Sequence, residues 1–450
     1  MAEMKSLDWF LAKLSSWVST HGYFPLAVTI ILVYSLIRVT YLLWFHPLSK
    51  IPGPKLAAVS NVYYGWACSD QGRPTFLKSD LLDDPSKYPG LFSVKDVDEH
   101  RAARRIFQPA FNPRLYSEYA PTIDKYVSMW LGKLEKLSAS AGGVDMTHWV
   151  EYLMADIGGM MAFGFEYRNI ESEHGGLLLE AISSFGWWGT LRVALKRFPL
   201  LSPLQWFFLR PHMLFTYIKS TATNVQAVAD RLKNRDQKRK DYMTPILTEG
   251  QPLPPTEYLT AHVTNIVYGH VETSTVATAA VYFLLMHPEV HRKLQQELRD
   301  NFRSFDQLTD KALQSIQWLG AVIDETIRLH TNVPYGLPRI SPGAEIDGYH
   351  IAKGCVVTTC AFATTHSPKY FQKPREFRPE RWLPRTHADY DKIFDHDNRS
   401  AFRPFSMGSR GCIGQGVAGE IHWERDLRLY TVWQKPPVKV RFHPASPTKA

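Results

Sequence analysis

The stretch Phe405–Gly414, F-S-M-G-S-R-G-C-I-G, constrains what this chain can fold into more than any other feature of its sequence. Three glycines and two serines surround Cys412, so the backbone can turn tightly beneath a flat ligand and direct its amides toward the sulfur. This arrangement predicts a single thiolate that serves as a ligand. The ordinary alternative is a buried cysteine that only packs, because free cysteine is among the most buried residue types.

The spacing within this stretch is also specific. Phe405, Gly408, Arg410, Cys412 and Gly414 reproduce the pattern F-x-x-G-x-R-x-C-x-G in full. In this pattern the chain resembles the cytochrome P450 family, whose loop supplies haem iron with its axial cysteine. The resemblance implies that Cys412 is the iron ligand, that the other four residues shape the cofactor site, and that the cofactor is haem b. In this family the thiolate pushes electron density onto iron and favours O–O cleavage.

Length and composition leave the number of domains open. A chain of 450 residues can hold two or three average domains, or one large helical enzyme domain with an anchor. Its four cysteines are too few and too scattered for a disulfide framework, which indicates a reducing compartment. The formal charge of +9 is dispersed and no nucleic-acid motif accompanies it, so acidic proteins or lipid headgroups are expected partners and nucleic acid is not.

A membrane anchor is predicted near the N-terminus. Tyr23–Phe45 carries only one charge, Arg38, and would span roughly 30 Å of hydrocarbon as a helix. A cleaved signal peptide fits less well, because the apolar run is too long and starts late. The flanking charges are too balanced to set the orientation, but the family resemblance implies a cytosolic domain on the endoplasmic reticulum. The expected order is an N-terminal segment 1–22, a transmembrane helix 23–45, a stiff proline-rich hinge 46–54 and a haem-thiolate domain 55–450.

Several basic residues are candidates for holding the cofactor. Glu99–Phe107 reads as a helix in which His100 and Arg104 share a face, since residues four apart are neighbours. A basic helical face is usually only solvated. The resemblance implies instead that both residues reach the haem propionates, together with Arg339 and Arg410. Three arginines facing two carboxylates would form strong charge-assisted hydrogen bonds.

The longest helical pattern is Leu259–Glu297. Gly269 and Thr273 are four residues apart within it, which places an open position beside a hydroxyl on one face. A threonine inside a helix usually bonds back to the carbonyl four residues earlier and does nothing more. The segment also resembles the family signature A/G-G-x-D/E-T-T/S, which implies that Thr273 and Glu272 are catalytic and deliver protons to the oxygen being activated. His270 departs from the signature, where glycine is normal.

A structural charge triad is predicted in the second half of the chain. Leu313–His330 has the apolar spacing of a buried helix, and Glu325 and Arg328 are three residues apart on it. Alone they would be an ordinary surface pair worth well under about 1 kcal/mol. The resemblance to the family's E-x-x-R implies a buried triad that Arg381 completes.

Two further regions affect the expected fold. Ser183–Arg210 is rich in aromatic residues, which could belong to the core or to a cover of the substrate pocket that dips into the bilayer, and the sequence does not decide between them. Segments near Ile346–Ile351 and Cys355–Thr364 resemble strands. The predicted fold class is therefore mainly α-helical with small β-sheets (α+β), the cytochrome P450 fold, with an N-terminal transmembrane helix.

The chain is expected to be shorter than other members of the family. After Cys412 the pattern C-x-G-x-x-x-A continues to Ala418, where the family runs on through a long apolar helix. A polar stretch, I-H-W-E-R-D-L-R-L-Y, follows almost at once here, so most of that helix is expected to be missing after 420. Only 45 residues separate Pro54 from His100, and the region 76–94 shows no strand alternation.

The predicted function is that of a haem-thiolate monooxygenase. It would insert one oxygen atom from O2 into an apolar small molecule, with electrons from NADPH delivered by a reductase. Arg101 and Arg105 would face that partner. The style of several motifs resembles fungal enzymes of secondary metabolism. The alternative is an impaired or inactive haem-binding paralogue with a truncated proximal helix, which His270 and the shortening favour.

Overall fold

The computed structural model describes most of the chain after residue 75. It describes residues 76–79, 84, 86–112, 115–138, 143–196, 198, 200–234, 240–247, 253–304 and 307–415, four isolated positions between 33 and 40, and residues 428–429, 433–434 and 438–440.

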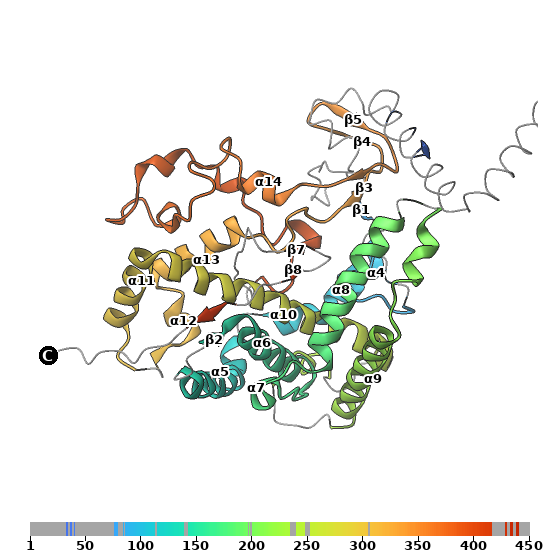
Figure 1. Ribbon diagram of the computed structural model, residues 1–450, viewed down its shortest axis with the longest axis horizontal. Helices are drawn as coiled ribbons and strands as arrows, with labels where there is room; N and C mark the ends of the chain where they lie inside the picture. Colours follow the sequence, from blue (N-terminus) through green and yellow to red (C-terminus); the bar gives the residue numbers. More distant parts are fainter. Residues whose placement is uncertain are drawn as a thin grey trace, which may run out of the picture.

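Helices form most of the described structure, and the long helix α10 (Thr256–Met286) runs through its middle (Figure 1). Helices α5 (Tyr116–Ser138) and α6 (Met146–Phe163) lie on one side of it, and α11 (Pro288–Asn301) and α13 (Gln317–Leu329) lie on the other. The remaining described α-helices are α4 (Val97–Phe107), α7 (Asn169–Ser172), α8 (Leu177–Lys196), α9 (Pro211–Lys233), α12 (Asp310–Leu313) and α14 (Ala361–Thr365). Short 3-10 helices are η4 (Gln108–Phe111), η6 (Ser202–Trp206), η8 (Pro379–Trp382), η9 (Lys392–His396), η10 (Arg399–Ala401) and η11 (Gly408–Arg410).

Helix ends follow local sequence signals. The Asp96 carboxylate accepts hydrogen bonds from the backbone N–H groups of Asp98 and Glu99 and so caps α4. Gly164 ends α6 in the left-handed region at φ 70°, which glycine adopts without a steric penalty. Pro288 begins α11 directly after α10, so the helical pattern Leu259–Glu297 is divided between two helices.

The β-structure consists of small antiparallel sheets. Strands β1 (Leu77–Lys78), β3 (Arg339–Ile340) and β6 (Val356–Val357) form a sheet in the order β1-β3-β6, in which Lys78 lies opposite Arg339. The remaining described strands form two-stranded sheets: β2 (Val144–Asp145) with β9 (Lys439–Val440), β4 (Ala344–Ile346) with β5 (Tyr349–Ile351), and β7 (Arg428–Leu429) with β8 (Trp433–Gln434). The prediction of a mainly helical fold with small sheets is confirmed.

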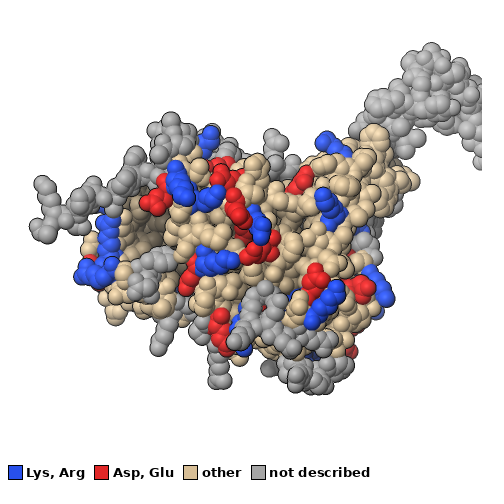
Figure 2. All heavy atoms as spheres, turned by 90° about the horizontal axis from the view of Figure 1, so that it is seen from below, with Lys and Arg blue, Asp and Glu red and all other residues tan. Residues whose placement is uncertain are grey.

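Two of the four apolar clusters contain most of the buried core among the described residues. The larger one joins α5, α6 and the first half of α10, and includes Phe107, Phe163 and Val267. The smaller one joins α11 and α13 to the segment after α14 through Trp318 and Phe377. On the face shown in Figure 2, Lys and Arg side chains are interspersed with Asp and Glu, as the dispersed charges in the sequence suggest.

The charge triad is present and fully buried. Glu325 receives the guanidinium of Arg328 at 2.8 and 2.9 Å and that of Arg381 at 3.0 Å. The side chains of all three are at most 1% exposed, so the reading as an ordinary surface pair is wrong. The indole N–H of Trp382 also donates to Glu325 at 2.9 Å, and Asp397 pairs with Arg381 from the other side. This network joins α13 to η8 and η9.

Some predicted element boundaries are wrong. The helix predicted over Leu313–His330 begins only at Gln317, because the preceding residues turn through α12 and Ile316 enters α13 with an extended backbone. The strand predicted over Cys355–Thr364 is limited to Val356–Val357, since α14 starts at Ala361. Among the described residues between 76 and 94, only Leu77–Lys78 forms a strand.

Several predictions concern residues that the structure does not describe. The predicted span Tyr23–Phe45 and the hinge His46–Pro54 lie almost wholly outside the described residues, as does the stretch 416–427. Among the helices that are described, none has the length and apolarity needed to cross a bilayer.

Candidate haem-binding site

The stretch Phe405–Gly414, called here the Cys loop, closes on itself through its backbone. The N–H of Cys412 donates to the carbonyl of Phe405 at 2.8 Å. The turn that permits this contact passes through Ser406 at φ 60° and Gly408 at φ 70°. The Cys412 residue is exposed, while a Cβ added to Gly414 would lie only 4.0 Å from the Cys412 sulfur. A Cβ at that distance would make only an ordinary van der Waals contact with the sulfur.

Two arginines connect the Cys loop to α4 and to the segment before it. Arg104 of α4 donates to the carbonyl of Gly411 at 2.6 Å. Arg410 donates in the other direction, to the carbonyls of Val94, Lys95 and Asp96 at 3.0–3.1 Å. A cavity of about 300 Å³ lies at this junction, and it is lined by Val97, His100, Arg101, Arg104, Gln108, Ser409 and Arg410.

The electrostatic environment of this junction is strongly positive. Burial, together with the charges of Arg410, Lys78, Arg104 and Arg339, lowers the pKa of His100 to about 3. His100 is therefore neutral at pH 7. The structure thus brings together all four basic residues that the resemblance assigned to the propionates, from α4, β3 and the Cys loop.

Lys78 belongs to the same group and was not predicted. Its side chain is 5% exposed, and the ammonium donates to the carbonyls of Leu91 and Phe92 at 3.0 and 2.6 Å. No motif in the sequence marks this residue. Its position becomes evident only when β1 pairs with β3, which sets Lys78 against Arg339.

These residues fit haem. Buried cations are costly unless an anion accompanies them, and haem carries two carboxylates at one edge. Lys78, Arg104, Arg339 and Arg410 would supply positive charge beside that edge, and the exposed Cys412 would supply the thiolate that ligates iron.

The predicted catalytic pair lies on α10. The hydroxyl of Thr273 donates to the carbonyl of Gly269 at 3.0 Å, as threonines inside helices usually do. Gly269 is exposed, and a Cβ built there would meet nothing within 4 Å. The carbonyl of Glu272 accepts a hydrogen bond from the Asn332 amide at 3.3 Å. An open face thus lies beside the Thr273 hydroxyl, and Asn332 connects this part of α10 to the segment that leads to Arg339.

His270 points away from that face. It is buried, and its Nε2 lies 3.0 Å from the hydroxyl of Tyr242. A Cβ added to Gly158 of α6 would come within 2.9 Å of the His270 Cβ, so the two helices are in close contact here. The orientation toward a neighbouring helix explains how a histidine can replace the usual glycine without filling the open space at Gly269.

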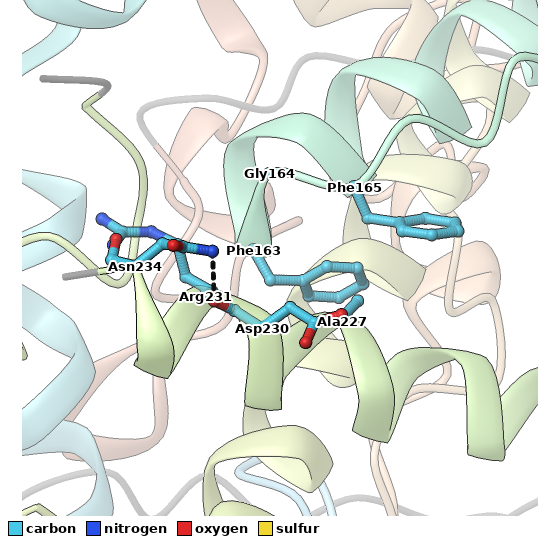
Figure 3. Close-up of a pocket in the computed structure, with 7 residues that line it drawn as sticks. All are labelled: Phe163, Gly164, Phe165, Ala227, Asp230, Arg231 and Asn234. Atoms are coloured by element: carbon cyan, nitrogen blue, oxygen red, sulfur yellow. Dashed lines mark hydrogen bonds between the residues drawn. The ribbon is translucent and has the colours of Figure 1, made fainter. Parts of the chain in front are cut away.

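A second hollow lies apart from these residues, between the C-terminal ends of α6 and α9 (Figure 3). It has a volume of about 190 Å³ and is lined by Phe163, Gly164, Phe165, Ala227, Asp230, Arg231 and Asn234. Its arginine is engaged on both sides, since Arg231 donates to the Asn234 carbonyl at 2.9 Å and to Asp241 at 2.6 Å. No predicted site residue lines it.

The fold and the Cys loop together define a haem-thiolate oxidoreductase. Residues 56–421 match the family model described as cytochrome P450. The chain therefore belongs to the cytochrome P450 family, and the predicted class, an oxidoreductase that incorporates molecular oxygen, is confirmed.

Curated relatives are named as monooxygenases or hydroxylases. The cytochrome P450 monooxygenase TwmD of Talaromyces wortmannii is 28% identical, with 90% of this chain and 93% of the relative aligned. The cytochrome P450 monooxygenase poxC of Penicillium oxalicum is 28% identical over 95% and 96% of the two chains. The trichothecene C-4 hydroxylase of Trichoderma arundinaceum is 27% identical over 93% and 96%. All three come from fungi.

A solved structure shares the fold. The crystal structure of the cytochrome P450DA haem domain superposes with a TM-score of 0.64, covering 80% of this chain and 82% of the other at 17% sequence identity. The sequence alignments with TwmD and poxC run over 477 and 494 positions, more than the 450 residues of this chain, so parts of both relatives have no counterpart here.

Proposed function

We propose that this protein is a haem-thiolate monooxygenase that inserts one oxygen atom of O2 into an apolar small molecule, with electrons from NADPH delivered by a reductase. The observation that carries the proposal is the junction of α4 and the Cys loop, where an exposed Cys412 lies in the complete family loop beside a group of buried and half-buried cations. Haem bound there supplies oxygen activation and electron transfer.

The residues on α10 have a separate role in the proposed reaction. Thr273 holds a hydroxyl beside the open face at Gly269. Glu272 directly precedes it on the same turn, and its backbone carbonyl accepts a hydrogen bond from Asn332. We assign proton delivery to this pair: Glu272 would be the exchangeable acid, and the Thr273 hydroxyl, which here donates to the Gly269 carbonyl, would pass the proton on. General acid assistance of this kind contributes about 10²–10⁴-fold to a rate.

The names of the relatives support the proposed substrate class. The relatives from Talaromyces and Penicillium are named only as monooxygenases, and the relative from Trichoderma is named for hydroxylation of a trichothecene. We assign this protein to oxidation of an apolar intermediate in fungal secondary metabolism. The pairing of Gly269 with Thr273 supports an oxygen-activating reaction on that substrate.

The membrane contact is part of the proposal. We place the domain on the cytosolic face of the endoplasmic reticulum, anchored by residues 23–45. The exposed apolar residues after α8 and at the start of α9 support a lipid contact in this region. Leu200, Trp206, Phe207 and Phe215 are 62–83% exposed. Trp188 on α8 is buried, so the aromatic region Ser183–Arg210 divides between core and surface.

The reductase partner is assigned to the α4 side of the molecule. Arg101 and Arg105 are exposed on α4, while Arg104 between them turns toward the Cys loop. An acidic partner could therefore bind two exposed cations on α4, the same helix whose Arg104 contacts the Cys loop.

The rival function is haem binding without turnover. It is favoured by the segments of TwmD and poxC that have no counterpart in this chain. One experiment separates the two functions. The full chain in detergent, with reductase and NADPH, is supplied with terpenoid, polyketide or aromatic precursors. Products heavier by one oxygen atom support the monooxygenase. NADPH consumption without any such product supports the impaired paralogue.

A further inference from the structure

Tyr242 and His270 share a buried hydrogen bond that the proposed reaction does not use. The phenol oxygen and Nε2 of the imidazole are 3.0 Å apart, and the two residues are only 2% and 8% exposed. The backbone N–H of Tyr242 donates to the carbonyl of Met161 at 2.8 Å, which fixes the tyrosine against α6. A phenol and an imidazole are therefore held together at a place that water does not reach.

The chemistry of this pair is that of an acid beside its base. Burial lowers the pKa of His270 to about 4, so the imidazole is neutral at pH 7. A neutral imidazole with its proton on Nδ1 accepts a hydrogen bond at Nε2 and can take up a second proton there. Oxidation makes a phenol strongly acidic, so loss of an electron from Tyr242 and transfer of its proton to His270 favour each other.

Closely packed atoms connect the pair to the Cys loop. The ring of Phe111 stacks on the ring of Tyr242, with centroids 4.9 Å apart and planes inclined by 24°. A Cβ placed on Gly414 would lie 3.9 Å from the Phe111 ring and 4.0 Å from the Cys412 sulfur, so both approach the same point of the loop. Electrons pass more readily through packed atoms than across gaps. A contiguous path therefore leads from the predicted iron ligand to Tyr242.

We propose that Tyr242 is a redox-active residue, which gives one electron to haem that hydrogen peroxide has oxidised while its proton passes to Nε2 of His270. Peroxide is the two-electron oxidant: its O–O bond breaks, water leaves, and haem and Tyr242 each lose one electron. The phenol O–H bond breaks and leaves a neutral tyrosyl radical beside a protonated imidazole. One electron from the reductase and the return of that proton restore Tyr242.

The expected benefit is protection of the haem site when oxygen activation is uncoupled from product formation. Uncoupled turnover releases peroxide, and an oxidising equivalent that moves to Tyr242 is kept in a buried, rigid place until it is reduced. The inference rests on the haem binding that is part of the proposed function, but not on oxygen insertion into a substrate.

The test is electron paramagnetic resonance of the full-length holoprotein, frozen rapidly after mixing with hydrogen peroxide in the absence of substrate. A tyrosyl radical should appear, and its signal should narrow when the protein is made with ring-deuterated tyrosine. The signal should be lost in Tyr242→Phe. It should also be lost in His270→Gln, because glutamine can accept a hydrogen bond but cannot take up the proton.

Tyr119→Phe is the matched control. Tyr119 is also buried, and its ring meets that of Tyr242 edge-on at 5.4 Å. Its hydroxyl donates to the carbonyl of Ala110 at 3.1 Å, and a peptide carbonyl is too weak a base to take the proton. The radical should therefore remain in Tyr119→Phe, and peroxide should bleach haem faster in Tyr242→Phe than in this control.

Every variant is first checked for the red-shifted ferrous carbon monoxide band, which reports thiolate-ligated haem. If Tyr242→Phe does not hold haem, His270→Gln and the deuterated unmodified protein still decide the question. Absence of the radical from the unmodified holoprotein, its persistence in either of these variants, or its loss in Tyr119→Phe would overturn the proposal. A holoprotein that forms the radical but no oxygenated product would support this inference and contradict the monooxygenase, so the two failures are distinguishable.

Discussion

The hydroxyl of Tyr242 lies 3.0 Å from Nε2 of His270, inside the contact between α10 and α6. Phe111 stacks on the Tyr242 ring at 4.9 Å, and the preceding residue, Asp241, pairs with the buried Arg231 of α9. The tyrosine is thus held in place from several sides. Its bond to His270 turns that side chain away from Thr273, on the same helix.

This relationship predicts an acid-sensitive contribution to stability. Burial lowers the pKa of His270 from 6.5 to about 4, so the unfolded chain binds this proton more tightly than the folded protein does. Stability should fall as the pH drops below 6.5, by roughly 1.4 kcal/mol for each pH unit, until about pH 4. His270→Gln cannot titrate and should remove this part of the loss in urea unfolding of the holoprotein.

Tyr242→Phe serves as the control, because it removes the hydroxyl but keeps the histidine buried. Its acid sensitivity should remain. Equal slopes of unfolding free energy against pH in His270→Gln and the unmodified protein would contradict the assignment to His270.

Loss of the thiolate should be visible in a spectrum. Cys412→Ala removes the sulfur of the Cys loop, so the red-shifted absorption of the ferrous carbon monoxide complex, which reports thiolate ligation, should be abolished. Cys360→Ala is the matched change at a half-buried cysteine outside the Cys loop and should leave that absorption in place. A Cys412→Ala protein that keeps the red-shifted band would exclude Cys412 as the ligand.

Removal of the Thr273 hydroxyl should uncouple NADPH oxidation from product formation. With proton delivery impaired, electrons should appear as peroxide and product formation should slow by about 10²-fold or more. Peroxide, product and NADPH are measured together for Thr273→Ala.

Thr278→Ala provides the comparison for that experiment. The Thr278 hydroxyl makes the same kind of bond, to the Ser274 carbonyl at 2.9 Å, but it is buried elsewhere on α10. Its coupling should match the unmodified enzyme. Unchanged coupling in Thr273→Ala would refute the role assigned to Thr273.

Breaking the charge triad should destabilise the fold. Arg381→Met leaves the buried carboxylates of Glu325 and Asp397 without one of their cations, which costs about 3–5 kcal/mol. Unfolding by urea with the Soret band as the probe should show a lower midpoint. Lys125→Met breaks an exposed pair with Glu166 and should cost less than about 1 kcal/mol. If the two substitutions lowered the free energy of unfolding equally, the buried triad would contribute no more to stability than an exposed ion pair.

The shortened chain should hold haem poorly. A missing apolar helix after Ala418, which lies outside the described residues, would remove about 1.5–3 kcal/mol for each large side chain that it buries. Total stability is only about 5–15 kcal/mol, so the haem-free protein should be largely unfolded. The measurement is haem content per purified chain, compared with a variant that carries a relative's helix after Ala418. Full occupancy and a sharp unfolding transition in the unmodified chain would show that the shortening is tolerated.

The sequence was most informative where chemistry depends on residues close together in the chain. The Cys loop could be predicted because five residues within ten positions set its turn and its ligand, and a turn of that length leaves few backbone choices. The spacing of Glu325 and Arg328 within one helical turn likewise predicted that they pair. The spacing of Gly269 and Thr273 predicted a shared helical face for the same reason.

Tertiary structure decided what depends on contacts between distant segments. Lys78 joins the cationic group only because β1 pairs with β3, and Asp397 reaches Arg381 only through the fold of the segment after η8. The direction of His270 was open from the sequence, since helical periodicity gives a residue's angle on a helix but not which neighbour packs there. By itself the sequence determined the Cys loop and the pairing of Glu325 with Arg328, because local spacing encodes them, and the loop motif indicated the family. The burial of that pair and the third member of the triad, Arg381, were implied by the family resemblance and not by spacing. The partners of His270 and the full set of buried cations required the folded chain, because burial and long-range charge exist only once distant segments meet.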